Sequence, residues 1–137
     1  MNPNLEQALF SISSNQEKSS GDYDEKALLA VVEEFGLPNL GDRIYTEIPP
    51  TVPFELVCIL FDLLAWRTDD NGSSVRRATE RWLIEGRDER RMLIALHLEA
   101  YPFISEKEMV EVLSKLKSTN PQITHRCAEL VRMRNGV

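Results

Sequence analysis

The sequence contains few of the residues that usually build a catalytic or metal centre. Its 137 residues include two cysteines, two histidines and six glycines. The glycines form no G-x-G-x-x-G, P-loop or G-x-S-x-G motif, so we expect neither a nucleotide-binding loop nor a nucleophile elbow. Cys58 and Cys127 stand alone in apolar segments, which favours reduced cysteines inside helices over a disulfide or a zinc site. We therefore expect no enzyme, no cofactor and no catalytic residue.

Long apolar runs and a leader sequence are also missing. No apolar segment approaches the roughly 20 residues that a helix needs to cross a bilayer. The first residues, MNPNLEQALFSISSNQEKSS, show no basic stretch followed by an apolar stretch and a cleavage site, so they do not resemble a secretory signal. A chain of this length usually forms one domain. We expect a soluble, cytoplasmic protein with a single helical domain over residues 1–137.

Helical patterns with clear starts and stops cover most of the chain, and strand patterns are nearly absent. The segment FELVCILFDLLAW is apolar on nearly every side, which predicts a central helix over 53–66. Four prolines in 37–53 leave space for at most a short helix at 42–46. In the N-terminal part, 1–21, we expect a helix over 5–12 followed by a loop of small polar residues. The sequence leaves open whether this loop is mobile. The other expected helices cover 22–35, 74–86, 88–101, 105–117 and 120–134, which makes an all-α fold of six to seven antiparallel helices.

Several side chains mark the ends and the inward faces of these helices. Ser73 or Ser74 is expected to cap the helix that starts there, and Ser105 and Asn120 the last two helices. The expected helix 88–101 directs Met92, Leu93, Leu96 and Ala100 inward and stops before Pro102.

The expected helix starts recur at a regular spacing. Those near Phe54, Asp88 and Gln122 are 34 residues apart, and those near Ser74 and Glu106 are 32 apart. This period is typical of helix pairs that bury their apolar faces against the next pair. We predict antiparallel hairpins stacked as a short HEAT-like αα repeat over 53–135. The tetratricopeptide pattern W-x2-L-G-x2-Y is absent, and an ordinary bundle of evenly sized helices would give the same period.

Charge is distributed unevenly along the chain. Residues 1–62 hold eleven acidic and three basic residues, whereas residues 63–137 hold eleven acidic and thirteen basic ones. An acidic half repels nucleic acid and attracts basic proteins. The arginines of the second half gather at 76, 77, 81, 87, 90 and 91, with four acids between them. Pairing within the helix hairpin is the favoured interpretation of this cluster, and a phosphate or acidic partner is the alternative.

The segment WRTDDNGSSVRRATERW resembles a calcium loop at first sight. Counting from Asp69, oxygen-bearing residues stand at positions one, three, five and twelve. The sixth position should be glycine but is Ser74, and the apolar eighth position is Arg76. We therefore reject a calcium site and expect no metal here.

The same segment is our candidate for binding another protein. Under the repeat, the turns 67–73 and 101–105 are equivalent and lie on one side of the stack, so Trp66 would lie beside Tyr101 and Phe103. Tryptophan, tyrosine and arginine are common in binding hot spots. The residues that we expect to contact a partner are Glu33, Glu34, Trp66, Asp69, Asp70, Asn71 and Tyr101. The alternative is that Trp66 and Phe103 plug the ends of the core while the acids keep the turn hydrated.

The two histidines are poor candidates for a metal site. His125 and Glu129 stand at i and i+4, the spacing of paired ligands, but no H-E-x-x-H or E-x-x-H motif is present. His97 lies in an apolar helical segment, where a hydrogen-bonded core histidine is the usual explanation. We expect no metal ligand among them.

Two features of the chain carry a resemblance to a known family. They are the helices starting at Phe54, Asp88 and Gln122 and the acids Asp22, Asp24, Glu33, Glu34, Asp69 and Asp70. In these features the chain resembles small acidic HEAT-like immunity proteins of bacterial toxin–immunity systems. The resemblance implies a non-enzymatic inhibitor that occludes the active site of a basic toxin or effector domain. A helical adaptor or a phage-encoded inhibitor would use the same surface, and a nucleic-acid-associated protein would use the arginine cluster 76–91 instead. No membrane partner is expected, and the sequence leaves the oligomeric state open.

Overall fold

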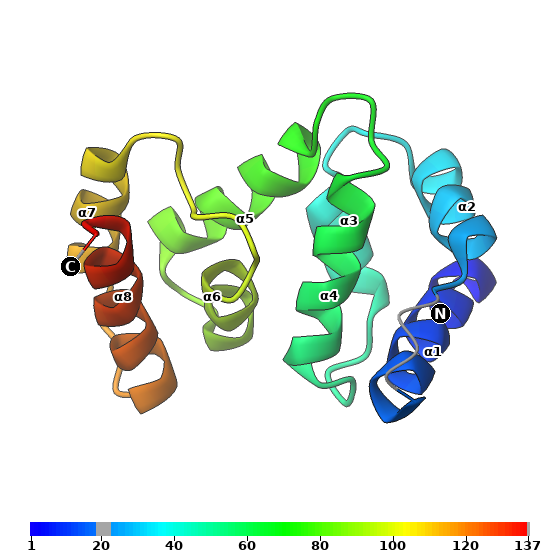
Figure 1. Cartoon of the computed structure of the whole chain (residues 1–137), viewed down its shortest axis with the longest axis horizontal. Coiled ribbons are helices and arrows are strands. Elements are labelled where there is room, and N and C mark those ends of the chain that lie inside the picture. The colour runs from blue at the N-terminus through cyan, green and yellow to red at the C-terminus, as the bar shows by residue number, and fades with distance from the viewer. Residues whose placement is uncertain (19–22, 137) are drawn as a thin grey trace. The chain divides into compact units, whose positions relative to one another are not determined.

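The computed structural model describes residues 1–18 and 23–136, which form eight helices and no strand (Figure 1). The all-α class is confirmed, and the predicted count of six to seven helices was too low. None of the described helices is long and apolar enough to cross a membrane. The helices are α1 (Pro3–Lys18), α2 (Glu25–Phe35), α3 (Leu40–Glu47), α4 (Phe54–Ala65), α5 (Ser73–Glu85), α6 (Glu89–Leu96), α7 (Glu106–Lys115) and α8 (Pro121–Arg134).

The chain divides into two compact units, and each is described by itself. The N-terminal unit comprises residues 1–78 and the C-terminal unit residues 79–137, so the boundary falls within α5. The single domain over 1–137 remains a prediction.

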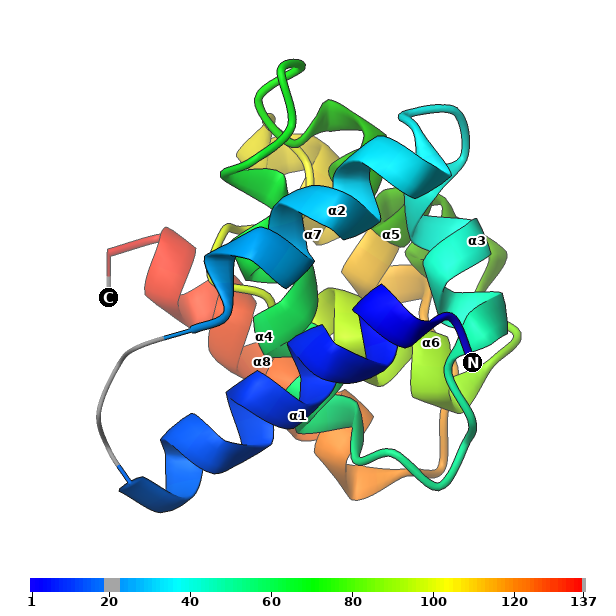
Figure 2. The same ribbon diagram turned by 90° about the vertical axis from the view of Figure 1, so that its right-hand side faces the viewer.

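In the N-terminal unit, α1 and α2 lie side by side in front of α4 (Figure 2). The central position predicted for α4 fits its burial, because Glu55 is its one exposed residue. The stripe predicted on α2 is also present, with Ala27, Leu28 and Val31 buried. Burying a leucine or valine side chain contributes about 1.5 to 3 kcal/mol, so these stripes hold the unit together.

Helix α1 is longer than the sequence pattern indicated. We expected a loop over residues 13–21, and this prediction is wrong for residues 13–18, because α1 continues to Lys18. Residues 19–21 of the expected loop lie outside the described residues. The buried face of α1 runs through Leu5, Leu9 and Ile12 to Asn15, whose amide donates to the carbonyl of Ser11 at 2.9 Å. Tertiary packing thus extends the helix into a segment whose polar composition suggests a loop.

A short helix, α3, occupies the proline-rich segment. It covers Leu40–Glu47, which is longer than the 42–46 that we expected, and it buries Leu40, Gly41 and Ile44. A Cβ atom at Gly41 would stand 2.8 Å from the Cβ of Ala78 on α5. The missing side chain therefore permits the close approach of α3 to the first part of α5.

In the C-terminal unit, α8 packs against both α6 and α7. The predicted caps are present, because the side chains of Ser105 and Asn120 accept the backbone N–H groups of Glu108 and Gln122. Helices α4 to α8 begin at residues 54, 73, 89, 106 and 121, each within one residue of the predicted start.

The helix predicted over 88–101 ends early, at Leu96. Met92, Leu93 and Leu96 are buried as predicted, but Ala100 is exposed, so its inward assignment was wrong. The guanidinium of Arg126 on α8 donates to the carbonyl of Leu96 at 2.9 Å and so satisfies a group that a continuing helix would have paired. A contact from a distant helix therefore sets this end.

We expect Gly41→Ala to destabilise the N-terminal unit by about 1 to 3 kcal/mol, because the new methyl group overlaps Ala78, although alanine is normally the better helix former. Denaturation followed by circular dichroism measures the change. The double variant Gly41→Ala/Ala78→Gly is the control, since it removes the opposing methyl group and should lose less stability than the two single changes together. Full additivity would contradict the close approach.

Candidate protein-binding surface

Trp66 is the most exposed aromatic side chain among those described, with 82% of its surface accessible. It forms the C-cap of α4 and begins the turn to α5, in which Asp69 and Asn71 are also exposed. Asn71 has a left-handed backbone, with φ of 57°. The alternative in which Trp66 plugs the core is wrong, because a plugging side chain would be buried.

Asp70 holds this turn in place and caps α5. Its two carboxylate oxygens accept the backbone N–H groups of Gly72 at 3.1 Å and of Ser74 at 2.9 Å. We predicted Ser73 or Ser74 as the cap of α5, but Asp70 is the main cap, because its side chain accepts the free N–H groups at the start of the helix. Thr68 completes the turn, since its hydroxyl donates to the carbonyl of Ala65 at 3.1 Å and accepts from Gly72 at 2.8 Å.

These contacts also set the charge state of Asp70. Partial burial raises its pKa, but hydrogen bonds from Thr68, Ser74 and Gly72 outweigh the burial and hold the pKa of Asp70 below its ordinary value. The carboxylate is therefore ionised at neutral pH. The carboxylate of Asp70 faces its own backbone, however, so Asp69 is the acid of this turn whose side chain is exposed.

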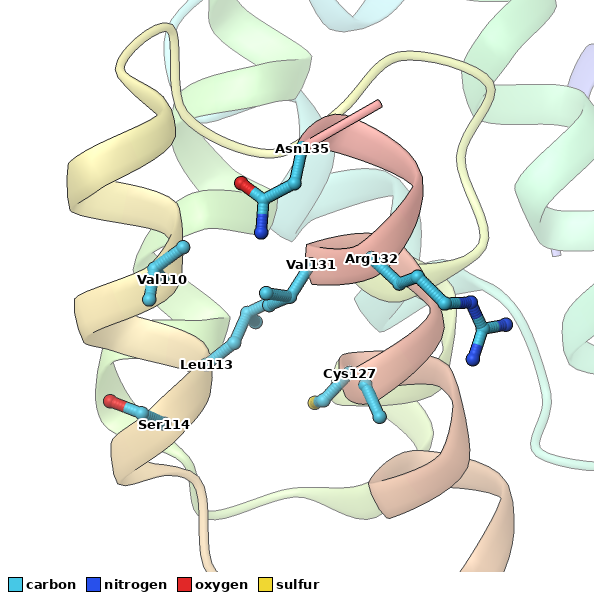
Figure 3. Close-up of a pocket in the computed structure, with 8 residues that line it drawn as sticks. Val110, Leu113, Ser114, Cys127, Val131, Arg132 and Asn135 are labelled. Carbon is cyan, nitrogen blue, oxygen red and sulfur yellow. The ribbon is translucent and has the colours of Figure 1, made fainter. Parts of the chain in front are cut away.

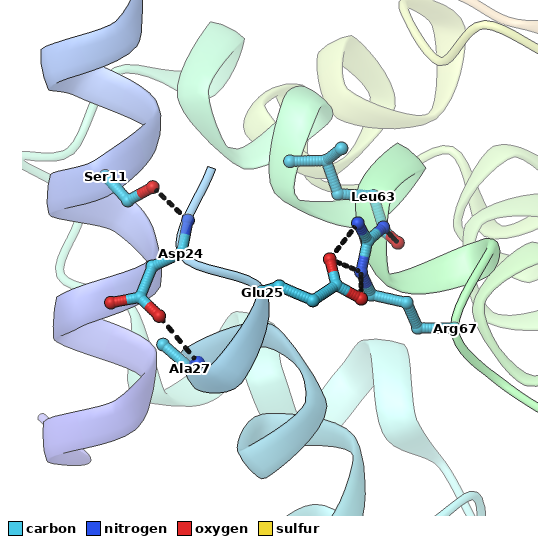
Figure 4. A network of polar contacts seen from close by, with 6 residues as sticks. All are labelled: Ser11, Asp24, Glu25, Ala27, Leu63 and Arg67. Carbon is cyan, nitrogen blue, oxygen red and sulfur yellow. Dashed lines mark hydrogen bonds and ion pairs between the residues drawn. The ribbon is translucent and has the colours of Figure 1, made fainter. Parts of the chain in front are cut away.

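A second contact joins the turn to α2 (Figure 4). The Nε atom of Arg67 donates to the two carboxylate oxygens of Glu25 at 3.0 and 2.9 Å, and its Nη1 atom donates to the carbonyl of Leu63 at 2.6 Å. A contact of the arginine guanidinium with both oxygens of a carboxylate fixes the position and the orientation of the two side chains. The turn is therefore attached to the start of α2 on one side and to the end of α4 on the other.

The remaining predicted acids do not join Trp66. Glu33 and Glu34 are exposed but lie at the opposite end of α2 from Glu25, about 13 Å along the helix axis. Glu34 also accepts hydrogen bonds from the side chains of Asn2, at 2.7 Å, and Asn4. The predicted acidic surface of this unit is therefore two separate patches.

The resemblance also rests on Asp24 and Asp22. Asp24 caps α2, because its Oδ1 atom accepts the N–H of Ala27 at 3.0 Å (Figure 4). Asp22 lies outside the described residues.

Tyr101 and Phe103 belong to the C-terminal unit, so their predicted position beside Trp66 remains a prediction. Phe103 is 3% exposed and plugs its unit, as the alternative interpretation expected for this residue, whereas Tyr101 is 38% exposed. Arg134 stacks on the Tyr101 ring at 5.2 Å from its centroid.

Arg134 and Glu80 fix the segment around Phe103, and the sequence analysis missed both. Arg134 donates to the carbonyls of Pro102 at 3.0 Å, Phe103 at 2.8 Å and Ile104 at 2.5 Å. Glu80 accepts the N–H of Phe103 at 2.7 Å. Phe103 has a φ of 65°, which is unfavourable for a bulky residue and persists only where surrounding contacts enforce it. No local motif announces such contacts, since Arg134 acts across 30 to 32 residues.

Three of the residues weighed as metal ligands are engaged in other contacts. Glu80, the twelfth position of the rejected calcium loop, accepts from Phe103. The ring of His97 forms the expected hydrogen bond, with the carbonyl of Leu93 at 2.8 Å, but His97 is half-buried at the C-cap of α6 and does not lie in the core. Glu129 pairs with Arg126, and this hydrogen bond lowers the pKa of Glu129. Across residues 1–18 and 23–136, no three acidic, histidine or cysteine side chains gather as a metal-binding group.

The arginine cluster contains ion pairs within its own hairpin. Arg81 lies 3.6 Å from Glu85, and Arg91 lies 3.8 Å from Asp88 and 5.6 Å from the centroid of the Trp82 ring. These contacts agree with the favoured interpretation of the cluster, although Arg77 and Arg87 are exposed.

Comparison of the chain with protein-family models, with curated proteins and with solved structures gave no match. The function must therefore be inferred from the turn itself. An exposed indole and an exposed carboxylate in one turn, those of Trp66 and Asp69, offer a large rigid ring and a negative charge to solvent.

We expect Asp70→Asn to lower the free energy of unfolding by about 1 kcal/mol at neutral pH, because the cap is weakened. The pKa of Asp70 is lowered in the folded state, so its contribution is complete above the ordinary pKa of about 3.9 and is lost as the pH falls through the lower folded value. Denaturant titrations between about pH 7 and pH 2 should therefore show the difference between wild type and variant shrinking in acid. Asp69→Asn, the exposed neighbour, is the control; an equal loss in both variants would contradict the capping role.

We expect Arg134→Ala to lower the stability of the C-terminal unit by about 2 to 3 kcal/mol, because three carbonyls lose a charged donor. Amide hydrogen exchange should show faster exchange at Phe103, whose strained backbone loses its support. Arg132→Ala changes an exposed arginine on the same helix and should shift stability by no more than about 0.5 kcal/mol. Unchanged protection at Phe103 would show that Arg134 does not hold the segment.

Proposed function

We propose that this chain is a stoichiometric protein-binding inhibitor, an immunity protein of bacterial origin that neutralises a cognate toxin in the cytoplasm by occluding its active site. The observation that carries the proposal is the 82% exposure of Trp66 on a turn whose backbone is fixed by Asp70, Thr68 and Arg67. It would act without cofactor or catalysis.

The size of the tryptophan side chain supports a binding role. An aromatic side chain of this kind buries about 150 to 250 Å² when covered, which corresponds to roughly 4 to 6 kcal/mol of apolar transfer free energy before opposing terms. Binding an already ordered turn avoids most of the entropy cost that a flexible loop would add. A partner with a pocket for the indole would therefore gain most of its affinity at this position.

Charge supports a basic partner. The N-terminal unit contains thirteen acidic and six basic residues, a formal charge of −7. Such a field accelerates association with a positively charged protein and opposes association with nucleic acid. The ion pairs of Arg81 and Arg91 also leave less of the arginine cluster for phosphate groups. A helical adaptor or a phage-encoded inhibitor would use the same turn against a different basic protein.

We propose further that the helices from α4 onward follow a HEAT-like αα repeat. The helices α4, α6 and α8 begin at residues 54, 89 and 121, and α5 and α7 at 73 and 106, which supports a period close to that of helical repeats.

The proposal is tested by co-expressing the chain with each protein encoded beside its gene. We expect one of these proteins to arrest growth alone, to be neutralised by the chain, and to form a one-to-one complex measurable by titration calorimetry. Trp66→Ala should weaken the complex about 30-fold or more, the effect of losing a hot-spot residue. Asp69→Lys should weaken it about tenfold and slow association.

Matched controls come from the same unit. Phe10 is an aromatic residue with 65% exposure on α1, and Glu47 is an exposed acid at the end of α3. Phe10→Ala and Glu47→Lys should leave the affinity within about threefold. The proposal fails if no neighbouring protein is neutralised, or if Trp66→Ala binds as tightly as the wild type.

A further inference from the structure

An apolar groove runs along the surface between α7 and α8 and encloses about 570 Å³ (Figure 3). Its floor is formed by Val110 and Leu113 from α7 and by Cys127 and Val131 from α8, and Ala128 forms part of its α8 side. The polar side chains that line it are Ser114, Arg132 and Asn135. The groove lies wholly within the C-terminal unit and shares no residue with the turn that carries Trp66.

Both helices bury other faces within their own unit. Ile123 and Leu130 of α8 and Met109 of α7 are buried, whereas Val110, Cys127 and Val131 are half-buried and Ala128 is exposed. On α8, the buried residues together with Cys127, Ala128 and Val131 form an apolar surface that is wider than the single stripe needed for packing against α6 and α7. The extra apolar surface is what a further pair of helices would cover, as in a four-helix bundle.

We infer that a second copy of this chain covers the groove, through a two-fold axis parallel to α7 and α8. In this arrangement α7 of one copy packs on α8 of the other, and the exposed Ala128 permits a close approach of the helices.

The charges at the edges of the groove match this arrangement. Figure 3 shows Val110 at about the level of Val131, with Asn135 above both, and Ser114 at about the level of Cys127. A rotation about a two-fold axis parallel to the helices does not change the height of a residue along that axis. Each residue of the second copy therefore lies at the same height as its counterpart in the first copy. Glu111, which follows Val110, then meets Arg132 of the second copy, and both side chains are exposed in the single chain.

The neighbouring lysines do not oppose this contact. Lys107 and Lys115 stand one helical turn to either side of Glu111, at the levels of Asn135 and Cys127, which are uncharged. On α8, the acid Glu129 is already held by Arg126. Arg132 is exposed at the edge of the groove, and Glu111 on α7 of a second copy supplies an acid that can pair with it.

The area of the face predicts a weak dimer. Helices α7 and α8 are about 15 and 21 Å long, and packed helices are about 9 Å apart, so the two-helix face covers roughly 300 to 400 Å². Standard stable interfaces bury about 800 Å² on each partner. We therefore expect a dissociation constant in the micromolar range, with monomer at low and dimer at high concentration.

Sedimentation of the full chain over about three decades of concentration tests the dimer, and charge exchange tests its face. Glu111→Arg and Arg132→Glu should each weaken association about three- to tenfold, because the contact between Glu111 and Arg132 occurs twice in a two-fold symmetric dimer. The double variant Glu111→Arg/Arg132→Glu restores the pair with reversed signs and should return to within about twofold of the wild type. Circular dichroism confirms that each variant folds.

Cross-linking of native cysteines gives an independent readout. Diagonal helices in a four-helix arrangement are roughly 13 Å apart, so a bismaleimide of similar span should join Cys127 to its counterpart. Burial raises the pKa of the Cys127 thiol, so the reaction is run at mildly alkaline pH. Cys127→Ser should abolish the product, whereas Cys58→Ser should not, because Cys58 is 4% exposed.

A monomer at every concentration would overturn the inference. A dimer that forms without the Cys127 product, or whose single charge variants the double variant does not rescue, would also overturn it, because the dimer would then use another face. None of these measurements depends on the proposed toxin partner.

Discussion

The structure depends on pairing the backbone groups that short helices leave free at their ends. Each α-helix ends with unpaired N–H and C=O groups, and the eight helices of the described residues multiply these ends. Here charged side chains satisfy many of them: Asp24 and Asp70 at helix starts, and Arg126 at the end of α6. Apolar stripes hold the helices together, and these polar contacts fix the starts of α2 and α5 and the end of α6.

This constraint explains which parts of the fold the sequence predicts. Starts of helices carry local signals, such as Ser105 before Glu108 or Asn120 before Pro121, and the predicted starts from α4 onward agree within one residue. Ends and extensions depend on distant partners. The early end of α6 requires Arg126 from α8, and the length of α1 follows from a buried face that continues to Asn15. A single sequence shows no pattern that joins residues so far apart.

The same constraint explains why the candidate site was only partly predictable. Acids that looked suited to a partner are largely committed to the chain itself, because Asp24 and Asp70 cap helices and Glu34 accepts from Asn2. A count of carboxylates in the sequence cannot distinguish a capping acid from an exposed one. Trp66 was recognisable only as one of two options, anchor or plug, and burial decided between them: Trp66 is exposed, whereas Phe103 fills the core.

The acids lost to capping still contribute to the proposed binding role, although indirectly. Asp70 cannot contact a partner strongly while it accepts two backbone N–H groups, yet those bonds hold the turn that presents Trp66 and Asp69. An exposed tryptophan on a mobile loop would lose much of its binding free energy to ordering, and an exposed tryptophan without neighbouring charges would favour aggregation. A rigid turn with one acid directed inward and one outward avoids both costs. The different roles of Asp70 and Asp69 therefore support the proposal that this turn binds a basic protein.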